Sequence, residues 1–241
     1  MKWLAPYVDL MFPPNCAFCR SALDTGGQGL LCSTCREELA DRRATCVRCA
    51  SVIVENADSA SDCRQCRGQR FHFDAAVRLG RYEGSRRSAV LRIKRSSERN
   101  LAVSLGNFLA AAERNRLRAM ALDGIVPVPM HWSRRIWRGV NSPETIAECL
   151  ARSLNLPLAP HLLTRRRRTA PQASLAPSKR RANVRGAFRA ARHADLPGAR
   201  LLLVDDIMTT GATVNEGAKE LRRAGASFVA VAVVARAEGM A

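Results

Sequence analysis

The run LLLVDDIMTTGAT, residues 201–213 of this 241-residue chain, restricts its fold more than any other segment. Its first four residues are large and aliphatic, and they follow neither a helical nor an alternating period. This pattern is typical of a strand that is buried on both faces of a parallel sheet. Asp205 and Asp206 come next, at the carboxyl edge where open α/β sheets bind their ligands. The run therefore predicts an α/β fold with a ligand site at that edge.

The residues after the acidic pair have the composition of a phosphate-binding turn. Three threonines offer hydroxyl groups, and a glycine lets the backbone turn so that successive NH groups converge on an anion. The predicted phosphate contacts are Thr209, Thr210, Gly211, Ala212 and Thr213.

A helix is predicted directly after this turn. Apolar residues recur at helical spacing from Val214 to Leu221. Thr213 and Glu216 fit a capping box at its start, and Gly225 fits a stop at its end. A bound phosphate would then face the positive end of the helix dipole and its unpaired NH groups.

The two carboxylates would repel a phosphate unless they face another group. Ionised aspartate only accepts hydrogen bonds, so Asp205 and Asp206 are expected to hold the hydroxyls of a ribose while the turn binds its 5-phosphate. At this point the run resembles the phosphoribosyl pyrophosphate (PRPP) motif of type I phosphoribosyltransferases: a hydrophobic strand, an acidic pair and then T-T-G-x-T. The resemblance implies PRPP as the ligand.

Two other structures are compatible with part of this run. One is a buried strand whose aspartates only cap the next helix. The other is the Walker B strand of a P-loop NTPase, which also ends in acidic residues. The chain contains no G-x-x-x-x-G-K-[ST], so the phosphate loop that a P-loop NTPase needs is absent from the sequence.

Eight of the nine cysteines form four CxxC pairs, which are separated by 12, 10 and 13 residues. A CxxC turn places two thiolates on one side of a metal, and a second pair completes a tetrahedron. The spacing therefore predicts two structural zinc ions in a double zinc ribbon, whose folding depends on the metal. The predicted ligands are Cys16, Cys19, Cys32, Cys35, Cys46, Cys49, Cys63 and Cys66.

The alternatives for these cysteines fit the sequence less well. Disulfides would require an oxidising compartment, and four pairs exceed what a thioredoxin-like redox site uses. Spacing favours one zinc on the first four cysteines and one on the last four, but it leaves a cross-braced pairing open. Cys149 lies in the predicted helix SPETIAECLARSL, with Ser142 as cap and Pro143 at its start, and is interpreted as a core thiol.

The basic charge of the chain is concentrated after residue 72. The formal net charge is +18, of which residues 73–241 carry +17, and residues 165–192 hold ten basic side chains and no acid. Such a surplus attracts polyanions, either nucleic acid or a pyrophosphate-bearing substrate. Arginine outnumbers lysine 35 to 4, which indicates a compositional bias. Few aromatic residues are present to stack bases, so no dedicated single-strand groove is predicted.

The segment between the cysteines and the PRPP motif carries a second group of arginines. Residues 86–118 are predicted to be helical, and Lys94 falls in a basic run interpreted as a solvated face. A buried strand at Ile125 must end in the VPVP sequence, because proline cannot donate to a central ladder. The next loop could bind pyrophosphate from the other side of the ribose. The candidates are Arg134, Arg135 and Arg138.

The stretch from Leu163 to Phe188 shows no periodicity and is interpreted as a long loop that closes over the ligand. Closure would exclude water from a reactive, oxocarbenium-like sugar. The candidate contacts in this loop are Arg168, Gln172, Arg181 and Asn183.

Together, the four CxxC pairs, the VPVP segment followed by R-x-x-RG-x-N, the T-x-x-Q and R-x-x-N motifs and VDDIMTTGAT resemble the ComF family. This resemblance implies a double zinc ribbon before a type I phosphoribosyltransferase-like domain, with a Rossmann-like parallel sheet flanked by helices. It also links some members to DNA uptake in natural transformation. We expect residues 1–70 to form the ribbon module and residues 71–241 the transferase-like domain.

The leading functional hypothesis is a phosphoribosyltransferase that binds PRPP with magnesium, with Asp205 and Asp206 as the catalytic pair. The acceptor of the phosphoribosyl group is not identified by the sequence. The alternative is a module without turnover that binds PRPP or single-stranded DNA and acts with DNA uptake proteins. The amino-terminal sequence contains Asp9 and three prolines where a signal peptide needs an apolar stretch, so a cytoplasmic protein without membrane insertion is expected.

Overall fold

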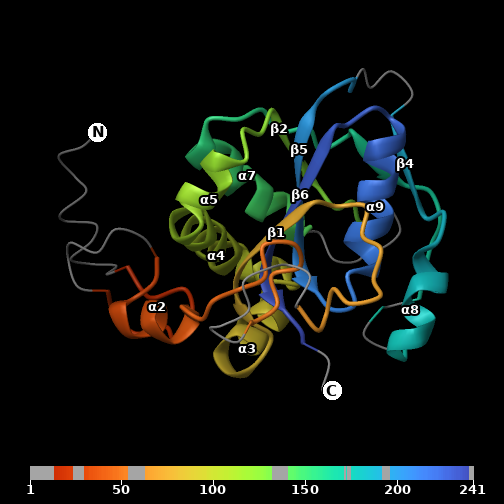
Figure 1. The fold of residues 1–241 in the computed structure, drawn as a ribbon. Helices are drawn as coiled ribbons and strands as arrows, with labels where there is room; N and C mark the ends of the chain where they lie inside the picture. Colours follow the sequence, from red (N-terminus) through yellow and green to blue (C-terminus); the bar gives the residue numbers. More distant parts are fainter. Residues whose placement is uncertain are drawn as a thin grey trace.

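The computed structural model describes residues 14–23, 30–53, 63–131, 141–170, 172, 175–191 and 196–238. Its centre is a parallel sheet of four strands in the order β1-β6-β5-β2 (Figure 1). The strands are β1 (Ala75–Arg81), β2 (Gly124–Pro127), β5 (Arg200–Met208) and β6 (Phe228–Arg236). The predicted α/β class is therefore confirmed.

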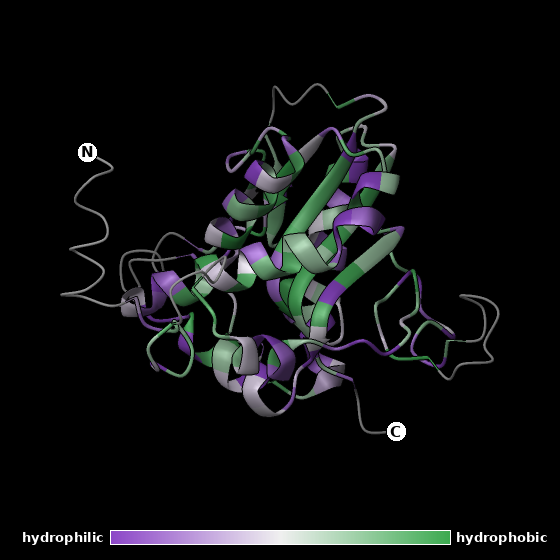
Figure 2. Ribbon diagram, turned by 90° about the vertical axis from the view of Figure 1, so that its left-hand side faces the viewer, coloured by the Kyte–Doolittle hydropathy of each residue, from purple (hydrophilic) through white to green (hydrophobic). Residues whose placement is uncertain are grey.

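The two central strands are apolar because helices cover both faces of the sheet (Figure 2). Leu202 and Val204 of β5 pack into one core, with residues of the helices on that side. Leu201 and Leu203 point to the other core. A strand with this double burial shows no alternating pattern, which explains the continuous aliphatic run in the sequence.

Two helical layers cover the sheet: α4 (Arg99–Ala112) and α7 (Ser142–Leu154) lie on one face, and α9 (Ala212–Arg223) lies on the other (Figure 1). One layer contributes Leu105 and Ile146 to the first core, and the other contributes Val214 and Leu221 to the second. The helices are α2 (Ser33–Leu39), α3 (Gly84–Arg92), the short 3-10 helix η2 (Ser96–Glu98), α4 (Arg99–Ala112), α5 (Arg114–Ala119), α7 (Ser142–Leu154), α8 (Pro177–Val184) and α9 (Ala212–Arg223).

The segment predicted to be a structureless loop is instead a small folded flap. Strands β3 (Leu163–Arg165) and β4 (Phe188–Ala190) pair antiparallel, and α8 lies between them in the sequence. Leu163 and Phe188 are buried in the second core. The buried residues are too few and too far apart in the sequence to produce a period, so the prediction was wrong here.

The cysteine-containing segments lie along the outer edge of β1. The backbone NH of Ala76 donates to the carbonyl of Val47 at 2.9 Å, and the NH of Arg81 donates to Asp41 Oδ2 at 3.2 Å. These bonds satisfy donors that an edge strand would otherwise expose. Cys16 and Cys35 also belong to the same apolar core as β1 and α3, so this part of the ribbon module shares its core with the sheet.

Cys149 lies where α4 and α7 pack closely. It is fully buried, and burial raises the pKa of its thiol. A Cβ placed on Gly106 of α4 would come within 2.9 Å of the Cys149 Cβ and 3.2 Å of the Ile146 Cα. Glycine at position 106 therefore allows the two helices to approach, and Cys149 is placed as the core thiol that the sequence predicts.

Replacing Gly106 with alanine is expected to destabilise the protein. Alanine improves helix propensity by about 1 kcal/mol, but overpacking against the backbone of α7 costs about 1–3 kcal/mol. Thermal unfolding should show a lower midpoint for Gly106→Ala. The exposed neighbour Asn107→Ala serves as the control and should not lower it; a higher midpoint for Gly106→Ala would contradict the close contact.

Candidate functional site

A cleft of about 630 Å³ lies at the carboxyl edge of the sheet. Strand β2 pairs with β5 only as far as Pro127, which is opposite Val204. The NH of Val128 still donates to the Val204 carbonyl at 2.8 Å, but Pro129 has no NH to continue the ladder. Strand β5 continues beside β6 to Met208. The early end of β2 therefore opens one side of β5 at the acidic pair.

Asp205 and Asp206 lie inside β5, and each residue is 9% exposed. The Asp205 carboxylate accepts the backbone NH of Asp206 at 2.9 Å. The Lys94 ammonium lies 3.4 Å from Asp206 Oδ2. The aliphatic run suggested a strand that stops before the acids, whereas pairing with β6 carries the strand through them.

Burial, together with the adjacent charge of Asp206, raises the pKa of Asp205 to about 8. The backbone NH of Asp206 and the ammonium of Lys94 act in the opposite direction but do not offset the loss of solvation. The pair therefore holds a proton over much of the neutral range. A cation or a donor hydroxyl that enters the cleft would favour release of this proton.

The turn after β5 has the backbone geometry of an anion site. Gly211 has a φ of 76° and precedes α9, which begins at Ala212. The NH of Ala212 donates to Thr210 Oγ1 at 3.4 Å. The other NH groups of the first helical turn have no partners within the helix, which is the arrangement that binds anions at helix N-termini. All five residues of the predicted phosphate turn, from Thr209 to Thr213, line the cleft.

The predicted capping box does not form. Gly211 is the cap residue, and α9 has no side-chain cap. Glu216 Oε1 instead accepts the backbone NH of Gly186 in the flap at 2.8 Å. Thr213 Oγ1 accepts the side chain of Gln172 at 3.3 Å. Thr213 and Glu216 thus form hydrogen bonds with the flap instead of capping the start of α9.

Sequence reasoning assigned Lys94 to a solvated face, but the structure places it in the cleft. Its side chain is 30% exposed and faces Asp206 from the segment after α3. The signal that could have singled it out is compositional, since Lys94 is one of four lysines in a chain with 35 arginines. Its proximity to β5 depends on the packing of α3, which no local pattern shows.

The structure separates the four candidate residues of the flap into two groups. Gln172 lines the cleft, and its Oε1 accepts Asn183 Nδ2 at 3.4 Å. Arg168 is exposed, while Arg181 is exposed and donates to the side chain of Gln69. Neither arginine is among the residues that line the cleft.

The flap arginines that do line the cleft are Arg165 and Arg180. Arg165 stacks over the ring of Phe188 at 5.2 Å, and Arg180 Nε donates to the Leu175 carbonyl at 3.0 Å. The R-x-x-N motif itself begins at Arg180, so this residue could have been chosen from the sequence. The predicted arginines at 134, 135 and 138 lie outside the described residues.

The eight CxxC cysteines form two separate clusters, and within each cluster the four sulfur atoms lie within 4.8 Å of one another. The arrangement is sequential, so the cross-braced alternative is excluded. One cluster is Cys16, Cys19, Cys32 and Cys35; the other is Cys46, Cys49, Cys63 and Cys66.

The sulfur spacing fits tetrahedral zinc. The Sγ atoms of Cys19 and Cys32 are 3.7 Å apart, and those of Cys49 and Cys63 are 3.6 Å apart. Zinc–sulfur bonds of about 2.3 Å in a tetrahedron place sulfurs about 3.8 Å apart. All nine cysteines are free of disulfides. The two clusters are therefore consistent with two structural zinc sites.

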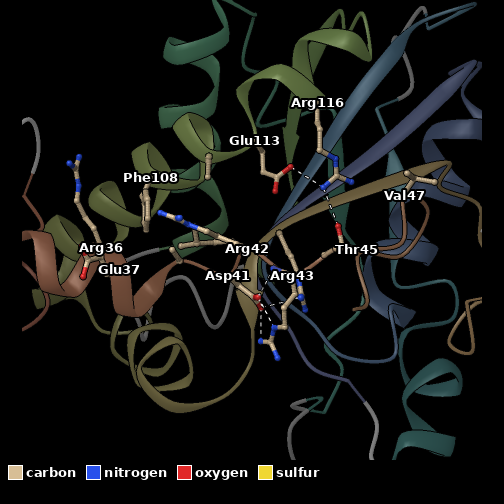
Figure 3. Close-up of a pocket in the computed structure, with 15 residues that line it drawn as sticks. Arg36, Glu37, Asp41, Arg42, Arg43, Thr45, Val47, Phe108, Glu113 and Arg116 are labelled. Atoms are coloured by element: carbon tan, nitrogen blue, oxygen red, sulfur yellow. Dashed lines mark hydrogen bonds and ion pairs between the residues drawn. The ribbon is translucent and has the colours of Figure 1, made fainter. Parts of the chain in front are cut away.

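A second cavity, of about 650 Å³, is lined on one side by residues 40–45, the segment that joins the two ribbons. Helices α4 and α5 line its other side (Figure 3). Asp41 accepts Arg43 Nε at 2.7 Å and Arg78 Nη2 at 3.1 Å. Burial opposes ionisation of Asp41, but the hydrogen bonds from Arg43 and the charge of Arg78 outweigh it and lower its pKa to about 2. The ion pair with Arg78 of β1 fastens the joining segment to the sheet.

Two parts of the chain match two different protein-family models. Residues 7–67 match the family model of the double zinc ribbon domain. Residues 144–239 match that of the phosphoribosyl transferase domain. The fold and the site thus define a protein in which a double zinc ribbon precedes a phosphoribosyltransferase-like domain.

Relatives that match nearly the whole chain define the family. Competence protein F of Haemophilus influenzae is 31% identical over 227 residues, which is 92% of this chain and 97% of that protein. DNA utilization protein YhgH of Escherichia coli K12 is 31% identical over 228 residues, which is 92% of this chain and 96% of that protein. The chain belongs to the ComF/YhgH family.

Among solved structures, the glutamine PRPP amidotransferase of B. subtilis overlaps with 60% of this chain and 30% of its own, with 21% identity and a TM-score of 0.40. Each helix in the described ranges is too short or too polar to span a lipid bilayer.

The raised pKa of Asp205 predicts a pH-dependent stability. An aspartate has a pKa of about 3.9 when unfolded, so the stability lost by burying Asp205 grows as pH rises toward its folded pKa. Asp205→Asn removes this loss, and its advantage should widen by about 2 kcal/mol between about pH 6 and about pH 8. Chemical unfolding across this range measures it. Asp123→Asn, which replaces an exposed carboxylate just before β2, is the control; an advantage of Asp205→Asn that does not change with pH would reject the assignment.

The two cysteine clusters predict the metal content. Elemental analysis of the purified protein should give two zinc ions per chain, and serine at Cys16 or at Cys46 should remove one of them. Cys149→Ser should retain both, because Cys149 lies outside the clusters. Zinc loss in Cys149→Ser, or full zinc content in the Cys46 variant, would contradict the ligand sets.

Proposed function

We propose that the cleft at the end of β5 binds PRPP together with magnesium. The observation that carries this proposal is the juxtaposition of a buried acidic pair with a glycine turn at the start of a helix, both of which line one cleft. A ribose offers hydroxyl donors to the acids, and its 5-phosphate is an anion for the turn. The family model of phosphoribosyl transferase domains matches this part of the chain and supports the same ligand.

In the proposed complex, Asp205 and Asp206 hold the ribose hydroxyls. The hydroxyls and NH groups between Thr209 and Thr213 hold the 5-phosphate. The ribose hydroxyls would supply hydrogen-bond donors to a carboxyl pair that is buried from solvent in the free protein. The proton held by the pair would be released when PRPP enters with its metal.

The pyrophosphate of PRPP would lie near the basic side chains of the cleft. Lys94, Arg165 and Arg180 line it, and guanidinium groups match phosphate oxygens in pairs. The arginine loop at residues 134–138 and the flap residues Arg168 and Arg181 belong to the same proposal as contacts made on closure. Magnesium bound together with PRPP would supply positive charge near the pyrophosphate, beside the acidic pair and the basic side chains of the cleft.

The reaction class that this arrangement serves is phosphoribosyl transfer. An acceptor nucleophile would form a bond to C1 of the ribose as the C1–oxygen bond breaks and pyrophosphate leaves with its negative charge. Cations beside the leaving group stabilise the charge that develops there. Gln172 and Arg180 of the flap line the cleft, and closure of the flap over the ligand would exclude water.

A second candidate function is a module that binds PRPP or single-stranded DNA without turnover. Two observations favour it: the names of the relatives, Competence protein F and DNA utilization protein, and the exposed basic run at Arg166, Arg167 and Arg168. Phosphate contacts of this kind are insensitive to sequence and weaken with salt. DNA uptake proteins would be the partners in that case.

Under either candidate function, we propose that residues 1–70 form the ribbon module and residues 71–241 the transferase-like domain. We also propose that the protein is located in the cytoplasm. Thiolate ligands stay reduced in the cytoplasm, which suits two zinc clusters and a chain whose nine cysteines form no disulfide.

Calorimetry with PRPP and magnesium tests the proposed ligand. Binding is expected for the native protein, and the double variant Asp205→Asn, Asp206→Asn should bind at least about a hundred-fold more weakly, because two charge-assisted hydrogen bonds of about 1.5–3 kcal/mol each are lost. Asp123→Asn is the matched control and should bind normally. Native affinity in the double variant would reject the site.

Two further measurements separate the candidate functions. Release of pyrophosphate with a base or nucleoside acceptor would establish transfer, whereas PRPP binding without product from any acceptor would favour the binding module. Binding to single-stranded DNA should fall steeply with salt and should weaken when Arg165 to Arg168 are neutralised.

A further inference from the structure

Arg236, the last residue of β6, is buried between the second cysteine cluster and the phosphate turn. It is 4% exposed. Its Nε donates to the carbonyl of Cys49 at 3.1 Å. Its Nη1 donates to the carbonyl of Met208 at 3.2 Å and also to the carbonyls of Thr209 and Ala237. One guanidinium therefore joins the backbone of a cluster cysteine to the backbone of the turn.

A pair of aromatic rings forms another connection between the same two elements. Phe71 and Phe73 stack with ring centroids 4.7 Å apart. Phe71 packs against the apolar cluster that contains Cys46 and Cys49. The position that a Cβ would take on Gly211 lies 3.5 Å from the Phe71 ring and 3.9 Å from the Phe73 ring. The turn therefore packs against the Phe71 and Phe73 rings, and Phe71 also packs against the second cluster.

The second ribbon is also fastened to the end of β6 by Glu238. Its Oε1 accepts the backbone NH of Val52 at 2.6 Å and pairs with Arg78 Nη1 at 3.2 Å. Its Oε2 pairs with Arg81 Nε at 3.2 Å. These contacts hold the segment after Cys49 against the sheet, so the Cys49 carbonyl is presented to Arg236 in a fixed position.

A buried guanidinium is stable only when its donors are satisfied, and here carbonyls satisfy them from two sides. The position of the Cys49 carbonyl depends on the position of its own Sγ, which a zinc ion would hold. Loss of the metal would free this residue and leave Arg236 with the carbonyls of Met208, Thr209 and Ala237. The Met208 and Thr209 carbonyls would then lose a fixed donor.

We propose that the second cysteine cluster, when it holds zinc, keeps the phosphate turn in its anion-binding shape through Arg236. Arg236 is a positioning residue, because its contacts run to the backbone of the turn and to the cluster. The effect on PRPP affinity rests on the proposed function. The effect on the shape of the turn does not.

The first cluster provides a natural comparison because it is fastened to a different part of the sheet domain. Arg92 at the end of α3 donates to the carbonyls of Ala17 and Phe18, at 3.1 Å and 2.6 Å, and stacks over the Phe18 ring at 5.4 Å. It also pairs with Glu98 at 3.0 Å. Arg92 thus holds the first ribbon as Arg236 holds the second, but within the described residues its hydrogen bonds and ion pairs do not reach the turn.

Hydrogen exchange of the backbone NH groups between residues 208 and 214 tests the proposal without any ligand. Arg236→Gln should raise exchange in this segment at least ten-fold while the protein keeps two zinc ions, and Arg236→Lys should restore part of the protection. Arg92→Gln is the matched control and should leave the segment unchanged. Unchanged exchange in a folded, zinc-loaded Arg236→Gln protein would overturn the proposal.

A pair of cysteine variants tests the role of the metal itself. Cys66→Ser and Cys19→Ser each remove one ligand, from the second and the first cluster respectively. Only Cys66→Ser should raise exchange in the turn and weaken PRPP binding; equal effects from both variants would overturn the proposal. A native protein that fails to bind PRPP would reject the proposed function, and the exchange comparison would still decide this inference.

Discussion

The parallel pairing of β5 with β6 is the interaction on which the rest of the structure depends. It runs from Arg200 opposite Phe228 to Met208 opposite Arg236, beyond the point where β2 has left the sheet. This register keeps the acidic pair in an extended backbone with one side open. It also places Arg236 beside the turn that follows β5, so that one strand pair positions both the cleft and its support.

The cleft and its surroundings contain ionisable groups that are buried from solvent when no ligand is bound. Asp205 is held at a raised pKa, and burial lowers the pKa of Arg236. Such groups reduce stability unless partners are supplied, and here the partners come from different segments: Lys94 from the helical layer and Cys49 from the ribbon. The arrangement of these groups therefore depends on contacts between distant segments. The second ribbon contributes one of these contacts, through the Cys49 carbonyl.

Much of the fold could be predicted because its signals are local. The aliphatic runs in β5 and β6 reflect burial on both faces, and the CxxC spacing reflects the geometry of a tetrahedral metal. The flap was missed because its strands have three residues each and acquire their burial from α9. The capping box was wrong for the same reason: Glu216 forms a hydrogen bond with the flap instead of the start of its own helix.

The sequence by itself determined which residues form the core of the candidate sites: the acidic pair, the threonine and glycine turn and the eight CxxC cysteines lie in short motifs whose members stay close together in the fold. Tertiary structure decided which distant side chains join them. Lys94, Arg180 and Arg236 reach the cleft or its turn only because a helix, the flap and a neighbouring strand bring them there. Basic residues are abundant in this chain, so their type carries little information, and their roles depend on three-dimensional proximity that no local pattern encodes.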